Sequence, residues 1–581
     1  MQGGGAAASP VRPARRGLAL GVLCLSLLIV TLDNTVLNVA LPTLVRDLGA
    51  TSTDLQWIVD AYVLVFAGLL LVSGSVADRF GRKWTFIAGL VGFAGCSIWA
   101  AFSGSVGMLI AARASMGVGG ALIMPSTLAL ITSMYTDPRE RQRAFGLWAA
   151  TTGAGVALGP IIGGLLLAHF SWGSVFLINV PIAALALVLA FPFVPNSRNL
   201  QAGRPDVLGA LLSISGLGLL LWAIIDAPVH GWSSPTVIGA GIGGVAVLVC
   251  FAVWERFASQ PMLRLSFFRR REFSVAVLSV SMVMFGLFGA LFVLTQFLQF
   301  DLGYTALQTG VRLLPAAGSI ILVAPFASLL ERAFGTKLVV GAGLLLIAGG
   351  LWEISGATVA TTYVGTLAGM IMLGVGAALV IPSVTASVMG SLPADHTGIG
   401  AATNSAFLQL GGALGVAVIG SQFSTRYQGQ MVAALAPYHF PAGVESTILG
   451  SVGGALEVAG REGGMAGEML AGWARTAFVS GMDLALMTGA LVAAAAALLA
   501  LLALPGRPQR GAPVRPRVVA PPSPAGGDAR IAGDGSVRTD GGSSSPCSKL
   551  SAGWAAPPGR TSPGCGTRGR QRRLGRLGRG A

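Results

Sequence analysis

Apolar residues fall along this chain in long runs that charged or turn-forming residues interrupt. Most runs approach or exceed about 20 residues, the length that an α-helix needs to cross roughly 30 Å of hydrocarbon. The pattern predicts an all-α integral membrane protein with about fourteen transmembrane helices. The runs lie at about 17–41, 55–77, 86–105, 107–133, 144–169, 173–194, 207–228, 235–257, 273–298, 308–330, 336–356, 361–390, 403–423 and 476–503.

Cationic residues collect in every second connection between these runs, and cytoplasmic loops are the ones that carry excess Lys and Arg. Both termini are therefore expected in the cytoplasm, which requires an even number of spans. The segment 424–474 has mixed charge and is expected to be a long extracellular loop, because long loops cross regardless of charge. The cationic connections contain Arg79, Arg82 and Lys83; Arg139, Arg141 and Arg143; Arg198 and Arg204; Arg264 and Arg269–Arg271; and Arg332 and Lys337.

Composition supports a membrane protein and argues against binding to nucleic acid. Hydrophobic residues make up 53% of the 581 and charged residues 10%, whereas a soluble domain has roughly 25% charged residues. The net charge of +15 is concentrated at the ends, since residues 504–581 hold 14 Lys/Arg against 3 Asp/Glu and residues 1–16 hold three arginines. Basic tails beside a nearly neutral membrane body suit contact with anionic lipid.

Residues for metal, cofactor or hydrolytic chemistry do not form recognisable motifs. The five cysteines and four histidines are scattered, which indicates packing residues and free thiols rather than a metal site or disulfide framework. No phosphate-binding Gly-Lys-Ser/Thr loop, dinucleotide fingerprint or nucleophile elbow stands in a suitable context. We therefore expect no cofactor and no enzymatic activity.

The connection after the second run reads Gly74-Ser-Val-Ala-Asp78-Arg79-Phe-Gly81-Arg82-Lys83. The two glycines are expected to permit a tight cytoplasmic turn. The carboxylate among three cations can pair with different helix ends in different conformations. A turn that only obeys the positive-inside rule is the alternative, but it would need neither Asp78 nor the glycines.

The fifth run has glycines every four residues, at Gly155, Gly159 and Gly163, followed by Gly164. This spacing places bare backbone on one face, so another helix can approach closely. Pro160 frees a carbonyl group and bends the span. A flexible, closely packed helix suits an interface that rocks, although glycine-rich faces also occur in membrane bundles without such a role.

Asp33 is a carboxylate about two thirds of the way through the first run, in Leu32-Asp33-Asn34-Thr35-Val36-Leu37-Asn38. Charges at membrane depth are costly and usually functional. Asp33 can take up a proton from outside and release it inside, or attract a cationic substrate. The alternative is a polar residue near the outer interface, satisfied by Asn34 and Asn38.

Arg113 opens the fourth run, in Arg113-Ala-Ser-Met116-Gly117. A structural arginine that pairs with a backbone carbonyl is one interpretation. Asp60, Asp226, Glu353 and Asp483 are the remaining acids at membrane level, all near predicted ends. Asp60 is the best of them as a second proton site.

These strings resemble signatures of the major facilitator superfamily. Gly74–Lys83 resembles its loop signature, the fifth run its antiporter signature, and the string around Asp33 the first helix of the fourteen-helix drug:proton antiporters of the EmrB/QacA type. The string around Arg113 is similar to the signature whose arginine is held to serve proton coupling, although Met116 replaces the usual Gln. Further matches extend the resemblance over residues 32 to 420, including Gln56-Trp57, Phe176–Pro181, Gln299–Pro315 and Gln409–Gly415.

The resemblance implies a major facilitator fold with two six-helix bundles, 17–194 and 273–503, around a central cavity. Residues 207–257 would be two extra linker helices, and the rocking of one bundle against the other would drive transport. It further implies a monomeric, proton-driven exporter of small, amphipathic organic compounds in the plasma membrane. A proton-symporting importer would keep the loop signature without the glycine-proline pattern. A non-transporting membrane receptor or enzyme on this scaffold is a third possibility.

The tail beyond Pro505 is rich in Gly, Pro, Ser and Arg and has few aliphatic residues. Such a composition cannot offset the entropy of ordering, so disorder is expected. A chain truncated after Pro505 should retain nearly all transport activity, measured as efflux at equal membrane expression. A truncated chain that inserts normally but does not transport would contradict this interpretation.

Overall fold

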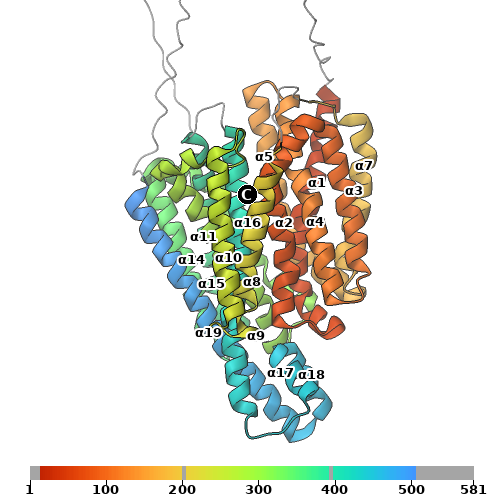
Figure 1. The fold of residues 1–581 in the computed structure, drawn as a ribbon, viewed down its shortest axis with the longest axis vertical. Coiled ribbons are helices and arrows are strands. Elements are labelled where there is room, and N and C mark those ends of the chain that lie inside the picture. Colours follow the sequence, from red (N-terminus) through yellow and green to blue (C-terminus); the bar gives the residue numbers. More distant parts are fainter. Residues whose placement is uncertain (1–12, 199–204, 392–396, 505–581) are drawn as a thin grey trace, which may run out of the picture. The chain divides into compact units, whose positions relative to one another are not determined.

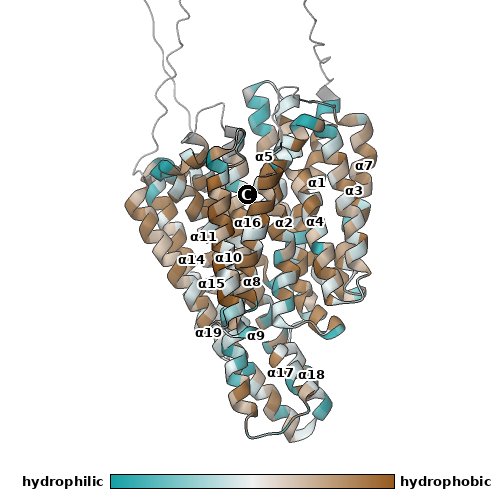
Figure 2. Cartoon of the chain, viewed as in Figure 1, coloured by the Kyte–Doolittle hydropathy of each residue, from teal (hydrophilic) through white to brown (hydrophobic). Residues whose placement is uncertain are grey.

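The computed structural model describes residues 13–198, 205–391 and 397–504, and every regular element among them is helical (Figure 1). Fourteen spans in this part are long and apolar enough to cross a membrane. Figure 2 shows apolar residues along these helices and hydrophilic residues gathered mainly toward their ends. The predicted all-α membrane fold is confirmed. The predictions for the tail from residue 505, and for residues 1–12, lie outside the described residues.

Several spans are built from more than one element. The sixth consists of α6 and α7, the ninth continues from α11 into a π-helical turn, and the tenth consists of α12 and α13. The helices are α1 (Pro13–Leu48), α2 (Ser52–Phe80), α3 (Arg82–Ala101), α4 (Val106–Met134), α5 (Pro138–His169), α6 (Ser174–Leu177), α7 (Asn179–Phe193), α8 (Val207–Ile225), α9 (Ala227–His230), α10 (Pro235–Phe257), η1 (Leu265–Arg269), α11 (Arg271–Gln296), η2 (Phe297–Asp301), α12 (Ala306–Arg312), α13 (Leu314–Phe334), α14 (Thr336–Ser355), α15 (Tyr363–Gly390), α16 (Thr397–Leu435), α17 (Ala442–Gly450), α18 (Val452–Glu462) and α19 (Gly464–Ala503).

Local sequence explains where α2 begins and ends. Thr51 and Asp54 form a reciprocal capping box, in which the Asp54 amide donates to Thr51 Oγ1 over 3.2 Å and the Thr51 amide donates to the Asp54 carboxylate over 2.9 Å. Gly81 ends the helix with φ of +108°, a conformation that favours glycine. A single residue thus separates α2 from α3.

The helices pack as an N-terminal half (α1–α7), a linker segment (α8–α10) and a C-terminal half (α11–α19). Within the linker, α8 packs against α10 and also contacts α2 and α16, one helix from each half. This grouping parallels the predicted boundaries 17–194, 207–257 and 273–503, which remain predictions as functional domains.

The two halves touch at the end of the bundle where α1 stops and α2 starts, which we call the first-loop end. There Gln299 donates from Nε2 to the Val39 carbonyl over 3.0 Å. A Cβ atom on Gly310 would lie 2.1 Å from the Pro160 carbonyl oxygen, and one on Gly420 would lie 2.6 Å from Gln56 Cδ. The halves are therefore in close contact at this end.

The segment 424–474 was expected to be a long extracellular loop, but it is helical along most of its length, and its location outside the cell remains a prediction. α16 continues to Leu435, α17 and α18 follow, and α19 begins at Gly464. In α18 the buried residues Val452, Ala455, Val458 and Ala459 share one face, while Arg461 and Glu462 are exposed. Arg461 and Glu462, two of the charged residues of this segment, thus lie on the solvent face of an amphipathic helix whose apolar side is buried.

Candidate functional site

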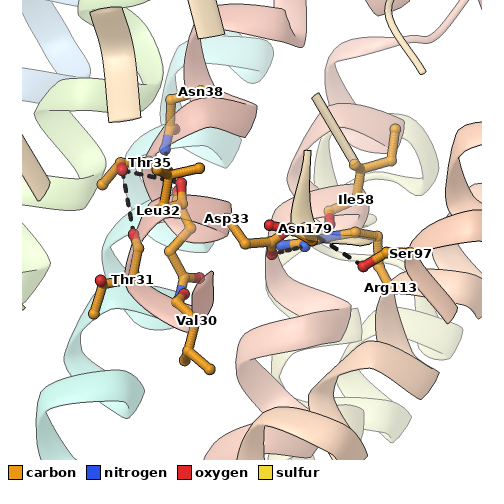
Figure 3. A network of polar contacts seen from close by, with 11 residues as sticks. Val30, Thr31, Leu32, Asp33, Thr35, Asn38, Ile58, Ser97, Arg113 and Asn179 are labelled. Atoms are coloured by element: carbon orange, nitrogen blue, oxygen red, sulfur yellow. Dashed lines mark hydrogen bonds and ion pairs between the residues drawn. The ribbon is translucent and has the colours of Figure 1, made fainter. Parts of the chain in front are cut away.

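A buried ion pair joins the first and fourth spans. Asp33 on α1 and Arg113 on α4 are 2% and 0% exposed, and Arg113 Nη1 donates to Asp33 Oδ2 (Figure 3). Arg113 lies two turns inside α4 rather than at its start. The structure therefore brings together the two ionisable residues that the sequence singled out on separate helices.

Three further helices complete the shell of this pair. Asn179 at the start of α7 donates from Nδ2 to Asp33 Oδ1 over 2.9 Å and lies 3.4 Å from Ser97 Oγ on α3. Arg113 Nε donates to the carbonyl of Ile58 on α2 over 3.0 Å. Both carboxylate oxygens of Asp33 and two nitrogens of Arg113 are thus bonded, as a buried charge pair requires.

Two aromatic rings border the guanidinium group. The Arg113 Cζ atom lies 4.5 Å from the ring centroid of Tyr62 and 6.0 Å from that of Phe176. The ring faces attract the cation and also exclude water from it. Arg113 is held both by its carboxylate and by its aromatic neighbours.

Asn34 and Asn38 are not hydrogen-bond partners of Asp33, so the alternative that gave them this role is wrong. Asn34 donates to the Val30 carbonyl and Asn38 to the Asn34 carbonyl, each over 3.0 Å within α1. Figure 3 shows Asn38 away from the Asp33 cluster, on another side of α1. Their place in a substrate cavity remains a prediction.

Asp60 on α2 is fully buried at 0% exposure. Neither of its carboxylate oxygens has a hydrogen-bond partner among the described residues. The sequence predicted that Asp60 lies near a helix end, but in the structure its side chain does not reach water. It is a separate acidic group that does not belong to the Asp33 network.

The connection between α2 and α3 holds one ion pair and several bonds to helix ends. Arg82 Nε lies 2.8 Å from Asp78 Oδ1, and Arg82 Nη1 donates to the Ala129 carbonyl at the end of α4. Lys83 Nζ donates to the Phe191 carbonyl on α7 over 2.7 Å. Arg79 lies over the Phe80 ring. The expected two-glycine turn is wrong for Gly74, which is inside α2 and has open space where a Cβ would be.

The glycines of α5 serve two different contacts. Cβ atoms on Gly155 and Gly159 would lie 2.0 Å from Thr31 Oγ1 and 1.9 Å from Thr35 Oγ1 on α1, and one on Gly163 would lie 3.0 Å from a Val36 methyl. On the other side, a Cβ on Gly164 would lie 2.6 Å from Leu307 Cα on α12. Beside it Gly310 meets Pro160, so α5 packs against both halves through bare backbone.

The other acids at membrane level have local partners or are exposed. Asp226, just beyond α8, accepts a hydrogen bond from Trp57 Nε1 over 3.2 Å. Burial raises the pKa of Asp226, and the Trp57 bond partly opposes this rise. Glu353 accepts from the Gly369 amide, and Asp483 is exposed. Within the described residues, no three His, Cys, Asp or Glu side chains gather as a metal site.

Comparison with known proteins places this geometry in a family. The model of the Major Facilitator Superfamily matches residues 23–416, and the chain belongs to that superfamily. It is 32% identical over 510 residues to the tetracenomycin C resistance and export protein of Streptomyces glaucescens, covering 86% of this chain and 93% of that one. It is 35% identical over 491 residues to the multidrug efflux pump LfrA of Mycolicibacterium smegmatis, covering 84% and 96%.

Solved structures show the same fold at low sequence identity. A bacterial homolog of the human lysosomal transporter Spinster, inward-facing and unoccupied, matches with a TM-score of 0.57 at 17% identity, over 85% of this chain and 97% of that one. The human organic anion transporter MFSD10 gives a TM-score of 0.53 at 18% identity, over 84% and 100%. The predicted family is confirmed, the fourteen spans agree with its fourteen-helix type, and the family and these relatives are transporters rather than enzymes.

The sequence missed three residues around the ion pair. Asn179 was covered only by the string Phe176–Pro181, and Tyr62 was not singled out, although each is a polar residue inside an apolar run. Ser97 had no distinguishing signal, because similar serines occur in many of the spans. Only the packing of α7 against α1, and of α3 against α7, shows that Asn179 reaches Asp33 and that Ser97 reaches Asn179.

Replacing only one residue of the ion pair should destabilise the protein more than replacing both. Arg113→Met should lower the free energy of unfolding by about 3–5 kcal/mol, because it leaves the Asp33 carboxylate buried without its cation. Adding Asp33→Leu should recover much of this loss, measured by denaturation of the purified protein in micelles. Additive losses in the double variant would contradict the coupling.

The close contact between α5 and α1 should not tolerate a methyl group. Gly159→Ala should lower stability by about 1–3 kcal/mol, because its Cβ would overlap the Thr35 hydroxyl. Thr35→Ala in the same chain should recover part of the loss. Gly153→Ala is the matched control, since open space surrounds that position, and a control that is equally destabilised would show a general intolerance of α5.

Proposed function

We propose that this chain is a proton-coupled antiporter that exports small, amphipathic organic compounds across the cytoplasmic membrane by alternating access. The buried Asp33–Arg113 pair carries the proposal, because Asp33 is an ionisable group inside a helical bundle and the stability of Arg113 beside it depends on the charge of Asp33. The relatives add support, since their names describe resistance, efflux and export.

Protonation of Asp33 would change the interactions of several helices at once. A neutral Asp33 no longer neutralises Arg113, and an unpaired buried cation is costly. The cost is relieved if α1, α4 and α7 shift, or if water or substrate reaches the site. Proton binding would therefore favour a different arrangement of the N-terminal half.

Asp60 suits the role of a second proton site. Burial of an unpaired charge is far more costly than burial of a neutral group, so Asp60 would be buried in its protonated form. It would release the proton only in a conformation that gives it water or a partner. Two acids on adjacent helices would then respond to the same opening motion.

Coupling requires that the proton and the substrate prefer different states, since a ligand shifts a conformational equilibrium only by its differential affinity. We propose that proton uptake from outside favours release of the substrate, and that loss of the proton to the cytoplasm resets the site. α5 would be a rocking contact, because its glycines let it touch α1 and α12 without interlocking side chains.

Orientation and partners complete the proposal. The cationic connections support an orientation with both termini in the cytoplasm and the first-loop end outside. The gradient of protons would be the energy source, with no cofactor. The protein would act as a monomer, with anionic lipid beside its basic tails.

Asp33→Asn should abolish efflux driven by a pH gradient while leaving insertion intact, because the amide keeps the size of the side chain but takes up no proton. The measurement is proton-coupled transport in everted membrane vesicles, with ethidium and tetracenomycin C as probes. Asp47→Asn is the matched control, since Asp47 is an exposed acid on the same helix.

We expect Asp33→Asn to abolish this efflux and Asp47→Asn to leave it unchanged, and an uncoupler should abolish the wild-type signal. Unchanged efflux in Asp33→Asn vesicles would remove Asp33 from the mechanism. Efflux that persists with the uncoupler present would contradict proton coupling altogether.

A further inference from the structure

Polar residues line the contact between α2 and α16, the helices that join the two halves at the first-loop end. Gln56 on α2 faces Gly420 on α16, where a Cβ atom would lie 2.6 Å from Gln56 Cδ and 2.8 Å from its Oε1. Ser52 lies one turn before Gln56, and Ser424 one turn after Gly420. Since the two helices run in opposite directions, this places Ser52 and Ser424 at the same level.

These side chains are buried without satisfying their hydrogen-bonding capacity. Ser52, Gln56 and Ser424 are 3%, 0% and 1% exposed. The hydroxyl groups of both serines and Oε1 of Gln56 have no hydrogen-bond partner among the described residues. We call Ser52, Gln56, Gly420 and Ser424 the α2–α16 seam.

Most buried serines elsewhere in this bundle are satisfied. Ser26 on α1 donates to the Val22 carbonyl over 2.8 Å, and Ser279 on α11 donates to the Val275 carbonyl over 2.7 Å. A serine in a helix thus has a partner at hand one turn back. Ser424 leaves the carbonyl one turn back unused, and Ser52 has no such carbonyl in its own helix, because it is the first residue of α2. Both serines lie where the halves must part for the first-loop end to open.

An unsatisfied buried polar group costs about 1–3 kcal/mol relative to its hydrated form. The seam therefore weakens the closed contact, and the same groups gain hydrogen bonds to water when the halves separate. Gly420 instead favours the closed contact, because only a residue without a side chain lets α16 approach Gln56 this closely.

We propose that the α2–α16 seam is the gate of the first-loop end, and that the unmet hydrogen bonds of Ser52 and Ser424 set how often it opens. These serines are positioning residues, which act on the balance between closed and open states rather than on the substrate or the proton. The inference rests on the proposed alternating access but assigns no part of it to Asp33.

The test uses distances across the first-loop end. Spin labels at Phe102 and Val359 report the separation of the two halves, since these positions are 70% and 48% exposed and follow α3 and α14. The full chain, with its native cysteines replaced, is placed in lipid nanodiscs at one fixed pH. Pulsed electron resonance then gives the ratio of open to closed molecules without substrate or gradient.

Gly420→Leu should wedge α2 from α16 and give a clearly measurable open population. Adding Ser52→Ala and Ser424→Ala to this variant should lower the ratio of open to closed molecules about tenfold or more, because two hydroxyls no longer gain water on opening. Adding Ser26→Ala and Ser279→Ala instead is the matched control. It should leave the ratio unchanged.

Two results would overturn the proposal. If Gly420→Leu does not widen the distance, the α2–α16 contact is not the gate. If the Ser52→Ala and Ser424→Ala changes leave the ratio equal or raise it, the hydroxyls are satisfied in the closed state, for instance through bridging water. Neither result depends on efflux by Asp33→Asn chains, so the proposal of a gate and the proposal of proton coupling can be contradicted independently.

Discussion

The arrangement of the N-terminal half depends on one constraint, the burial of opposite charges where neither can reach water. Such a pair is stable only if geometry and hydrogen bonding are nearly complete. Asp33 and Arg113 meet this requirement with groups from five helices, so the positions of α1, α2, α3, α4 and α7 are mutually dependent. A change in the charge of one side chain therefore affects the packing of most of this half.

Much of the fold follows from the solvent. Bilayer lipid requires long apolar helices, and this requirement is so strong that hydropathy alone predicted all fourteen spans. This requirement does not apply to the connections between spans, and the helices α17 and α18 within 424–474 were not predicted. Helices such as α18 follow from the contacts of an apolar face, which depend on partners distant in sequence. The role of Gly74 was misjudged because a glycine's use depends on where the helix ends.

The sequence predicted those residues of the candidate site that are charged and stand within an apolar run. An acid or an arginine within an apolar run is costly enough to be noticed without a structure, which is why Asp33 and Arg113 were found. Serine and asparagine cost less and are common in membrane helices. Their importance depends on whether a partner is present, and the contrast between Ser26 and Ser424 appears only when the helices are packed.

Two of the places where the halves meet are built differently. Where α2 meets α16, α8 contacts both helices and so stands between this junction and the surrounding lipid. Where α5 meets α12, backbone touches backbone, and most of the tenth span, α12 with α13, is left unburied. A compound dissolved in the bilayer therefore meets α8 in front of the α2–α16 junction, but only the tenth span at the α5–α12 junction. The linker helices thus give the protein two different lipid-facing sides.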